Sequence, residues 1–122
     1  MRLLIVDDNA AVRRLIRSIV QPFASEISEC ADGGDALSAY QARRPDIVLM
    51  DIRMKEVDGI QATREIKVAD PKARVIIVTD YDDDGLREAA ARAGACAYAL
   101  KDNLLDLARL LGAMDKRNPK EV

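Results

Sequence analysis

The chain has 122 residues, enough for one domain with its own core, and nearly half of them are apolar while a third are charged. A formal net charge of −2 gives no basic excess for nucleic acid, and no apolar run reaches the roughly 20 residues of a membrane span. The first residues enter a predicted strand, which leaves no room for a signal peptide, so we expect a cytoplasmic domain that binds neither nucleic acid nor membrane.

The first apolar run, residues 3–6, is short and branched, which predicts a buried strand that ends on Asp7 and Asp8. Asn9 then caps a predicted helix that stops near Pro22. The apolar positions of this helix recur at helical spacing: Val12, Leu15, Ile16 and Ile19. Residues 26–30 alternate weakly and predict an edge strand. After a turn at 32–34, a second helix is expected to face inward through Ala36, Leu37, Ala39 and Tyr40.

Residues 47–50 are an unbroken apolar run that predicts a strand buried on both faces and ends on Asp51. A polar loop leads to Gly59, which opens a helix with one apolar face: Ile60, Thr63 and Ile66. Residues 74–78 predict another buried strand, which delivers Thr79. Residues 82–93 predict a helix closed by Gly94, and residues 95–100 predict a fifth strand that ends at Lys101. The last helix starts near Asn103 and buries Leu104, Leu107, Ala108 and Leu111.

Five strands that alternate with five helices predict an α/β fold, a doubly wound five-stranded parallel sheet. We expect one domain over residues 1–114 and a polar tail over residues 115–122. Cys30 and Cys96 fall in the second and fifth predicted strands. If these are the two edges of the sheet, the cysteines are too far apart for a disulfide and are expected to be small buried side chains.

In such sheets ligands bind outside the carboxyl ends of the strands, where Asp7, Asp8 and Asp51 stand. Two like charges about 4 Å apart cost on the order of 4 kcal/mol at an effective dielectric near 20. Three carboxylates on neighbouring strands therefore predict a divalent metal site. The chain contains no histidine, which excludes Ser/His or Cys/His catalysis, imidazole metal ligands and a phosphohistidine of its own.

Four strand ends thus carry Asp7-Asp8, Asp51, Thr79 and Lys101. Together with Met54, Asp58-Gly59, Gly94-Ala95 and Tyr98, in this order from Leu3 to about Leu111, they resemble the receiver domain of two-component response regulators. The run Leu100-Lys101-Asp102 resembles the receivers of LuxR/NarL-type regulators. The resemblance implies the flavodoxin-like (βα)5 fold with strand order 2-1-3-4-5.

The resemblance also implies a phosphorelay phosphoprotein. Asp51 would accept a phosphoryl group from a sensor histidine kinase or a histidine phosphotransfer protein and form an aspartyl phosphate. Asp7, Asp8, Asp51 and the backbone carbonyl of Arg53 would bind Mg²⁺ or Mn²⁺. Thr79 and Lys101 would bind the phosphoryl oxygens. The domain would catalyse only its own phosphorylation and dephosphorylation, so it is not a conventional enzyme.

A switch is implied as well: Thr79 moves toward the phosphoryl group, and Tyr98 turns inward behind it. This reshapes the face of the fourth helix, fifth strand and fifth helix for an output domain, a partner protein or a phosphorylation-dependent homodimer. Three positions depart from the family pattern. Lys55 replaces a common proline and predicts a looser loop, and Asp102 replaces the proline after Lys101. Asp80 adds a negative charge that would slow phosphorylation, or slow or speed hydrolysis.

Three alternative functions differ from the receiver function in the residues that they need. A pseudo-receiver would be a phosphorylation-independent interaction module. A haloacid-dehalogenase-like phosphatase needs a second aspartate two residues after the nucleophile, where Arg53 stands, and a cap domain. A nucleotide-binding module is disfavoured because Asp7 and Asp8 repel phosphate. No helix-turn-helix follows, so a stand-alone receiver and a fragment of a longer LuxR-type regulator both fit.

Overall fold

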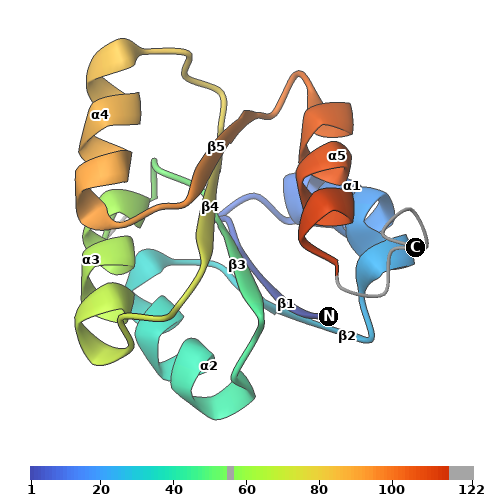
Figure 1. Ribbon diagram of the computed structural model, residues 1–122, viewed down its shortest axis with the longest axis horizontal. Helices are drawn as coiled ribbons and strands as arrows, with labels where there is room; N and C mark the ends of the chain where they lie inside the picture. Colours follow the sequence, from blue (N-terminus) through green and yellow to red (C-terminus); the bar gives the residue numbers. More distant parts are fainter. Residues whose placement is uncertain (55–56, 116–122) are drawn as a thin grey trace.

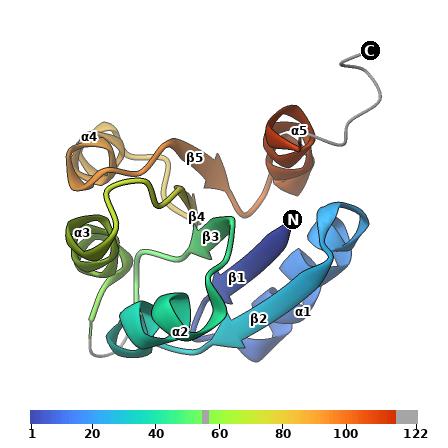
Figure 2. The same ribbon diagram turned by 60° about the horizontal axis from the view of Figure 1, so that its bottom comes forward.

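The structure, a computed structural model, describes residues 1–54 and 57–115. It contains a five-stranded sheet in the order β2-β1-β3-β4-β5, with every neighbouring pair parallel (Figures 1 and 2). The strands are β1 (Arg2–Val6), β2 (Glu26–Cys30), β3 (Ile47–Met50), β4 (Val75–Thr79) and β5 (Ala97–Leu100). The predicted fold class and strand order are confirmed.

Helices cover both faces of the sheet, with α1 and α5 on one face and α2, α3 and α4 on the other (Figure 2). The helices are α1 (Ala10–Val20), α2 (Ala36–Arg43), α3 (Gly59–Ala69), α4 (Asp84–Ala93) and α5 (Leu104–Met114), with short 3-10 turns at η1 (Gln21–Phe23) and η2 (Gly33–Asp35). No helix in the described ranges is long and apolar enough to cross a membrane.

The central strands are apolar on both faces because each face packs against helices. In β1, Leu4 and Val6 contribute to the core under α2, α3 and α4, while Leu3 and Ile5 contribute to the core under α1 and α5. This two-sided burial explains why the strand runs show no polar alternation. The register pairs Val6 with Met50, so the residues that follow both strands emerge side by side.

Side-chain caps set the start of three helices. Asn9 accepts hydrogen bonds from two backbone N–H groups of α1, and Asp58 accepts one from Gln61 in α3. In α4 the cap is Asp83, whose side chain accepts the N–H of Gly85. The helix therefore starts at Asp84, two residues later than the sequence pattern indicated.

Two expectations about burial are wrong. Leu15 was expected to face inward, but its side chain is 52% exposed, and Val20 is buried on α1 instead. Cys96 is exposed because it precedes β5, whereas Cys30 is partly buried; both thiols are free. Lys55 and residues 116–122 lie outside the described part of the chain, so the looser loop and the polar tail stay predictions.

Arg44 ends α2 in the left-handed region, with φ 50° and ψ 57°. This conformation costs a non-glycine residue about 1–2 kcal/mol. Arg44→Gly is expected to raise the free energy of unfolding by about 0.5–1 kcal/mol, since the greater freedom of glycine in the unfolded chain offsets part of the relief. Urea denaturation measures this. Arg43→Gly, inside the last turn, is the control and should lower stability by about 1 kcal/mol; equal losses in both variants would contradict the strain at Arg44.

Candidate functional site

Three carboxylates meet at the carboxyl edge of the sheet. Asp7 and Asp51 directly follow the paired residues Val6 and Met50, and the Asp51 N–H donates to the Val6 carbonyl at 2.9 Å. One carboxylate oxygen from each of Asp7, Asp8 and Asp51 lies within 4.8 Å of the others. Asp7 and Asp51 are buried, and Asp8 is exposed. The predicted clustering of these three residues is therefore present in the structure.

Lys101 places a cation among these carboxylates. It follows β5, and its side chain reaches back toward the centre of the sheet. The Nζ atom lies 2.8 Å from Oδ2 of Asp7 and 3.1 Å from Oδ1 of Asp51. One ammonium therefore bridges two buried carboxylates that belong to different strands.

The surroundings shift the protonation of both partners. The pKa of Asp51 is raised to about 6: burial is the largest cause, the charge of Asp7 adds to it, and Lys101 opposes the rise. Burial lowers the pKa of Lys101, but its close contact with Asp7 and the charge of Asp51 outweigh this, so the net pKa is raised. At neutral pH the site therefore holds an ionised Asp51 beside an ammonium.

The carboxylate oxygens of the cluster are suitable ligands for a hard divalent cation. Oδ1 of Asp7 accepts the Asn9 N–H at 2.8 Å, and Oδ1 of Asp51 accepts the Ile52 N–H at 3.0 Å. The buried Oδ2 of Asp7 has no hydrogen-bond partner of good geometry in the described residues and meets only the ammonium of Lys101. Oxygen ligands with this excess of negative charge suit Mg²⁺ or Mn²⁺.

Thr79 ends the neighbouring strand β4, and in the described part of the chain its side chain has no hydrogen bond with the carboxylates. It is fully buried at the end of β4, and its carbonyl accepts the Lys101 N–H at 2.8 Å. Its Oγ1 accepts the N–H of Tyr81 at 3.3 Å. The hydroxyl proton of Thr79 is then still available to a ligand, because a hydroxyl both donates and accepts.

Tyr98 and Arg53 meet at Tyr81. The Tyr98 hydroxyl donates to the Tyr81 carbonyl at 2.6 Å, and the Arg87 guanidinium lies 4.5 Å from the centroid of the Tyr98 ring. The Arg53 guanidinium lies 4.9 Å from the centroid of the Tyr81 ring. The carbonyl of Arg53 stays a predicted ligand, because the observed cluster consists of the three aspartates.

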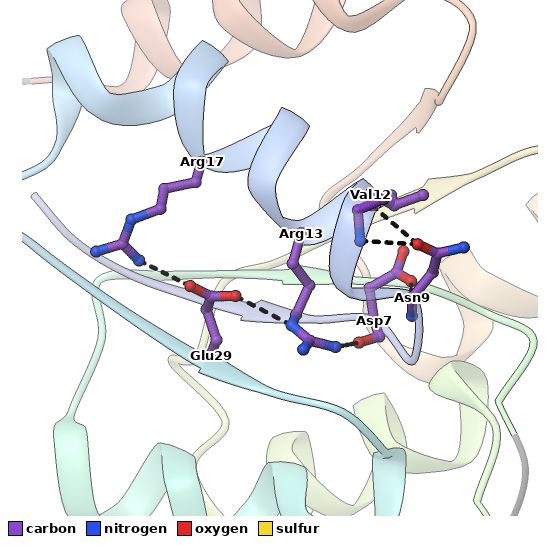
Figure 3. A network of polar contacts seen from close by, with 7 residues as sticks. Asp7, Asn9, Val12, Arg13, Arg17 and Glu29 are labelled. Atoms are coloured by element: carbon purple, nitrogen blue, oxygen red, sulfur yellow. Dashed lines mark hydrogen bonds and ion pairs between the residues drawn. The ribbon is translucent and has the colours of Figure 1, made fainter.

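Sequence reasoning missed two residues beside the site. Tyr81 carries no periodic signal, although it touches Arg53, Thr79 and Tyr98. Arg13 lies on α1, and its guanidinium donates to the carbonyl of Asp7 (Figure 3). Its position in a helix pattern gave no reason to expect a contact with the strand end.

Gly59 belongs to the Asp58-Gly59 motif, and the structure shows why a glycine stands at this position. A Cβ at this position would lie 1.8 Å from the carbonyl oxygen of Asp51. The Gly59 N–H donates to the Ile52 carbonyl at 2.8 Å, so α3 begins directly against the strand end that carries Asp51. Only glycine allows this approach.

Comparison with known proteins gives a consistent result. The family model described as the response regulator receiver domain matches residues 3–114. The chemotaxis protein CheY of Bacillus subtilis is 38% identical over 116 residues, which are 94% of this chain and 95% of that protein. The transcriptional regulatory protein LiaR of Bacillus subtilis is 34% identical, and the match covers 98% of this chain and 58% of LiaR.

Solved structures agree with these relatives. The CheY-like receiver domain protein of Methanospirillum hungatei superposes with a TM-score of 0.85 at 26% identity, over 99% of this chain and 98% of that chain. A chain of the CheX–CheY–BeF3–Mg²⁺ complex of Borrelia burgdorferi has a TM-score of 0.80 at 28% identity, over 95% of this chain and 90% of that chain. With its strand-end carboxylates and Lys101 in place, this chain belongs to the response regulator receiver family.

Proposed function

We propose that Asp51 accepts a phosphoryl group from a phosphohistidine on a partner kinase or phosphotransfer protein. The observation that carries this proposal is the meeting of three carboxylates and Lys101 at one edge of the sheet. An oxygen of Asp51 attacks phosphorus, the P–N bond to the imidazole breaks, and an acyl phosphate forms. Water later attacks the same phosphorus and releases inorganic phosphate. With a pKa of about 6, Asp51 is ionised for this attack at neutral pH.

The chain's own residues have separate roles in the transfer. Mg²⁺, held by Asp7, Asp8, Asp51 and the Arg53 carbonyl, would neutralise charge on the phosphoryl oxygens. Lys101 already lies 3.1 Å from Oδ1 of Asp51, so its ammonium is in place to bind a phosphoryl oxygen. Thr79 would donate a hydrogen bond from its hydroxyl group to another phosphoryl oxygen.

Membership of the receiver family supports a proposal about the cellular role of the domain. We propose that residues 1–114 form one receiver domain that acts in the cytoplasm. Its phosphorylation changes the face of α4, β5 and α5, which then binds an output domain, a partner protein or a second copy. Tyr98 is well placed to report the change, because it lies on β5 and its hydroxyl binds the carbonyl of Tyr81, two residues after Thr79.

Incubation with acetyl phosphate and Mg²⁺ should add one phosphoryl mass to the intact protein. The gain should be lost with a chelator and in Asp51→Ala, and should persist in the control Asp102→Asn, which removes an exposed charge outside the cluster. Mass spectrometry of the intact protein measures this. No gain under any condition would refute the proposal and favour a pseudo-receiver.

Stability should respond to pH through Asp51. Because its folded pKa is raised to about 6, its stabilising contribution is present below about pH 4 and is lost as the pH rises through 6. In chelator, Asp51→Asn should therefore raise the free energy of unfolding by about 1–2 kcal/mol at pH 8 and have no effect near pH 4. Urea titrations at both values test this, with Asp102→Asn as the control. A less stable Asp51→Asn protein at pH 8 would show that the Lys101 pair outweighs burial.

Thr79→Ala should separate phosphorylation from the switch. The variant should still gain a phosphoryl group on Asp51, but the Tyr98 ring should no longer respond to it. Thr79→Ser keeps the hydroxyl and should respond as the wild type does. NMR of tyrosine labelled at Cζ reports the ring environment. A full Tyr98 response in phosphorylated Thr79→Ala would contradict the coupling.

A further inference from the structure

The turn that carries Asp7 and Asp8 is held from outside the carboxylate cluster by Arg13. The Nη1 of Arg13 donates to the carbonyl oxygen of Asp7 at 2.6 Å (Figure 3). Its Nε pairs with Oε1 of Glu29 at 3.0 Å, and Arg17 pairs with Oε2 of Glu29 at 2.8 Å. The Arg13 side chain is 19% exposed, against 46% for Arg17, so Arg13 is the inner member of this network.

The bound carbonyl lies just past the end of the strand ladder. The last β1–β2 pair is Val6 with Cys30, and the Asp7 N–H still donates to the Cys30 carbonyl at 3.1 Å. In the described part of the chain, no backbone N–H donates to the carbonyl of buried Asp7. Arg13 therefore satisfies a buried acceptor that would otherwise be left without a partner.

This carbonyl belongs to the peptide that joins Asp7 to Asp8. The Asp7 carboxylate has local partners in Asn9 and Lys101. The Asp8 carboxylate is exposed and has no hydrogen bond or ion pair with other described residues. Its place in the carboxylate cluster thus depends on how the Asp7–Asp8 peptide is oriented, and Arg13 is the side chain that donates to the carbonyl of this peptide.

We propose that Arg13 is a positioning residue for the divalent cation: it fixes the Asp7–Asp8 peptide so that both carboxylates face one ion. Glu29 has a second role, since its charge offsets a guanidinium that would repel a nearby cation. The proposal rests on the proposed function, because it assumes that the cluster binds Mg²⁺.

A positioning role and a purely electrostatic role of Arg13 predict opposite effects of its removal on cation affinity. Removal of a positive charge near a cation site should strengthen cation binding, whereas loss of a ligand-orienting contact commonly weakens it by about 10- to 100-fold. Arg14 is a matched control, because it is exposed, adjacent on α1, and its side chain makes no hydrogen bond or ion pair with other described residues. Arg13→Ala and Arg14→Ala remove the same charge, but only Arg13→Ala removes the contact with Asp7.

The experiment measures Mn²⁺ affinity by electron paramagnetic resonance of the free ion, with Mg²⁺ as competitor. Arg13→Ala should weaken binding by about tenfold, while Arg14→Ala should leave it unchanged or slightly tighter. Glu29→Gln should weaken binding less than Arg13→Ala does. Arg13→Lys, which keeps a donor for the carbonyl, should recover part of the loss.

A second readout excludes general damage. With acetyl phosphate, Arg13→Ala should need more Mg²⁺ for half-maximal phosphorylation but reach the wild-type rate at saturation, and circular dichroism should show a folded protein. Equal cation affinities in folded Arg13→Ala and Arg14→Ala would overturn the inference alone. Failure of the wild type to bind Mn²⁺ or Mg²⁺ would overturn the proposed function instead.

Discussion

The contact on which the site depends is the sharing of one ammonium by two buried carboxylates. Lys101 lies within 3.1 Å of Asp51 and 2.8 Å of Asp7, although it follows the edge strand and they follow the central ones. Without this cation, two like charges about 4 Å apart would repel by on the order of 4 kcal/mol at an effective dielectric near 20. In the proposed function, the same ammonium binds a phosphoryl oxygen. The group that holds the two carboxylates together would thus also serve the proposed transfer.

The sequence predicted those parts of the fold that depend on local pattern. Strands buried on both faces are unbroken apolar runs, and a polar residue directly after such a run must emerge at the carboxyl edge. Asp7, Asp51, Thr79 and Lys101 could therefore be placed without coordinates. Leu15 was misplaced because helical spacing fixes only the centre of an apolar face, and residues at its margin are exposed or buried according to the neighbouring helix.

The contacts that support the site could not be predicted in this way. Arg13 meets Glu29 because α1 lies beside β2 and Glu29 faces the helix. Tyr81 meets Arg53 because two loops from different strands lie side by side. Both contacts join residues whose separation is decided by tertiary packing, and each residue alone looks like an ordinary surface side chain.

The amino ends of the strands, which lie opposite the aspartates, carry a separate set of contacts. There the Arg2 N–H donates to the Asp46 carboxylate at 2.7 Å, and Arg44 holds its left-handed conformation while its carbonyl accepts from the Arg2 side chain. The length of the strands separates these contacts from the aspartates. Substitutions at the amino ends of the strands can therefore change the free energy of unfolding while the carboxylate cluster at the other end keeps its geometry.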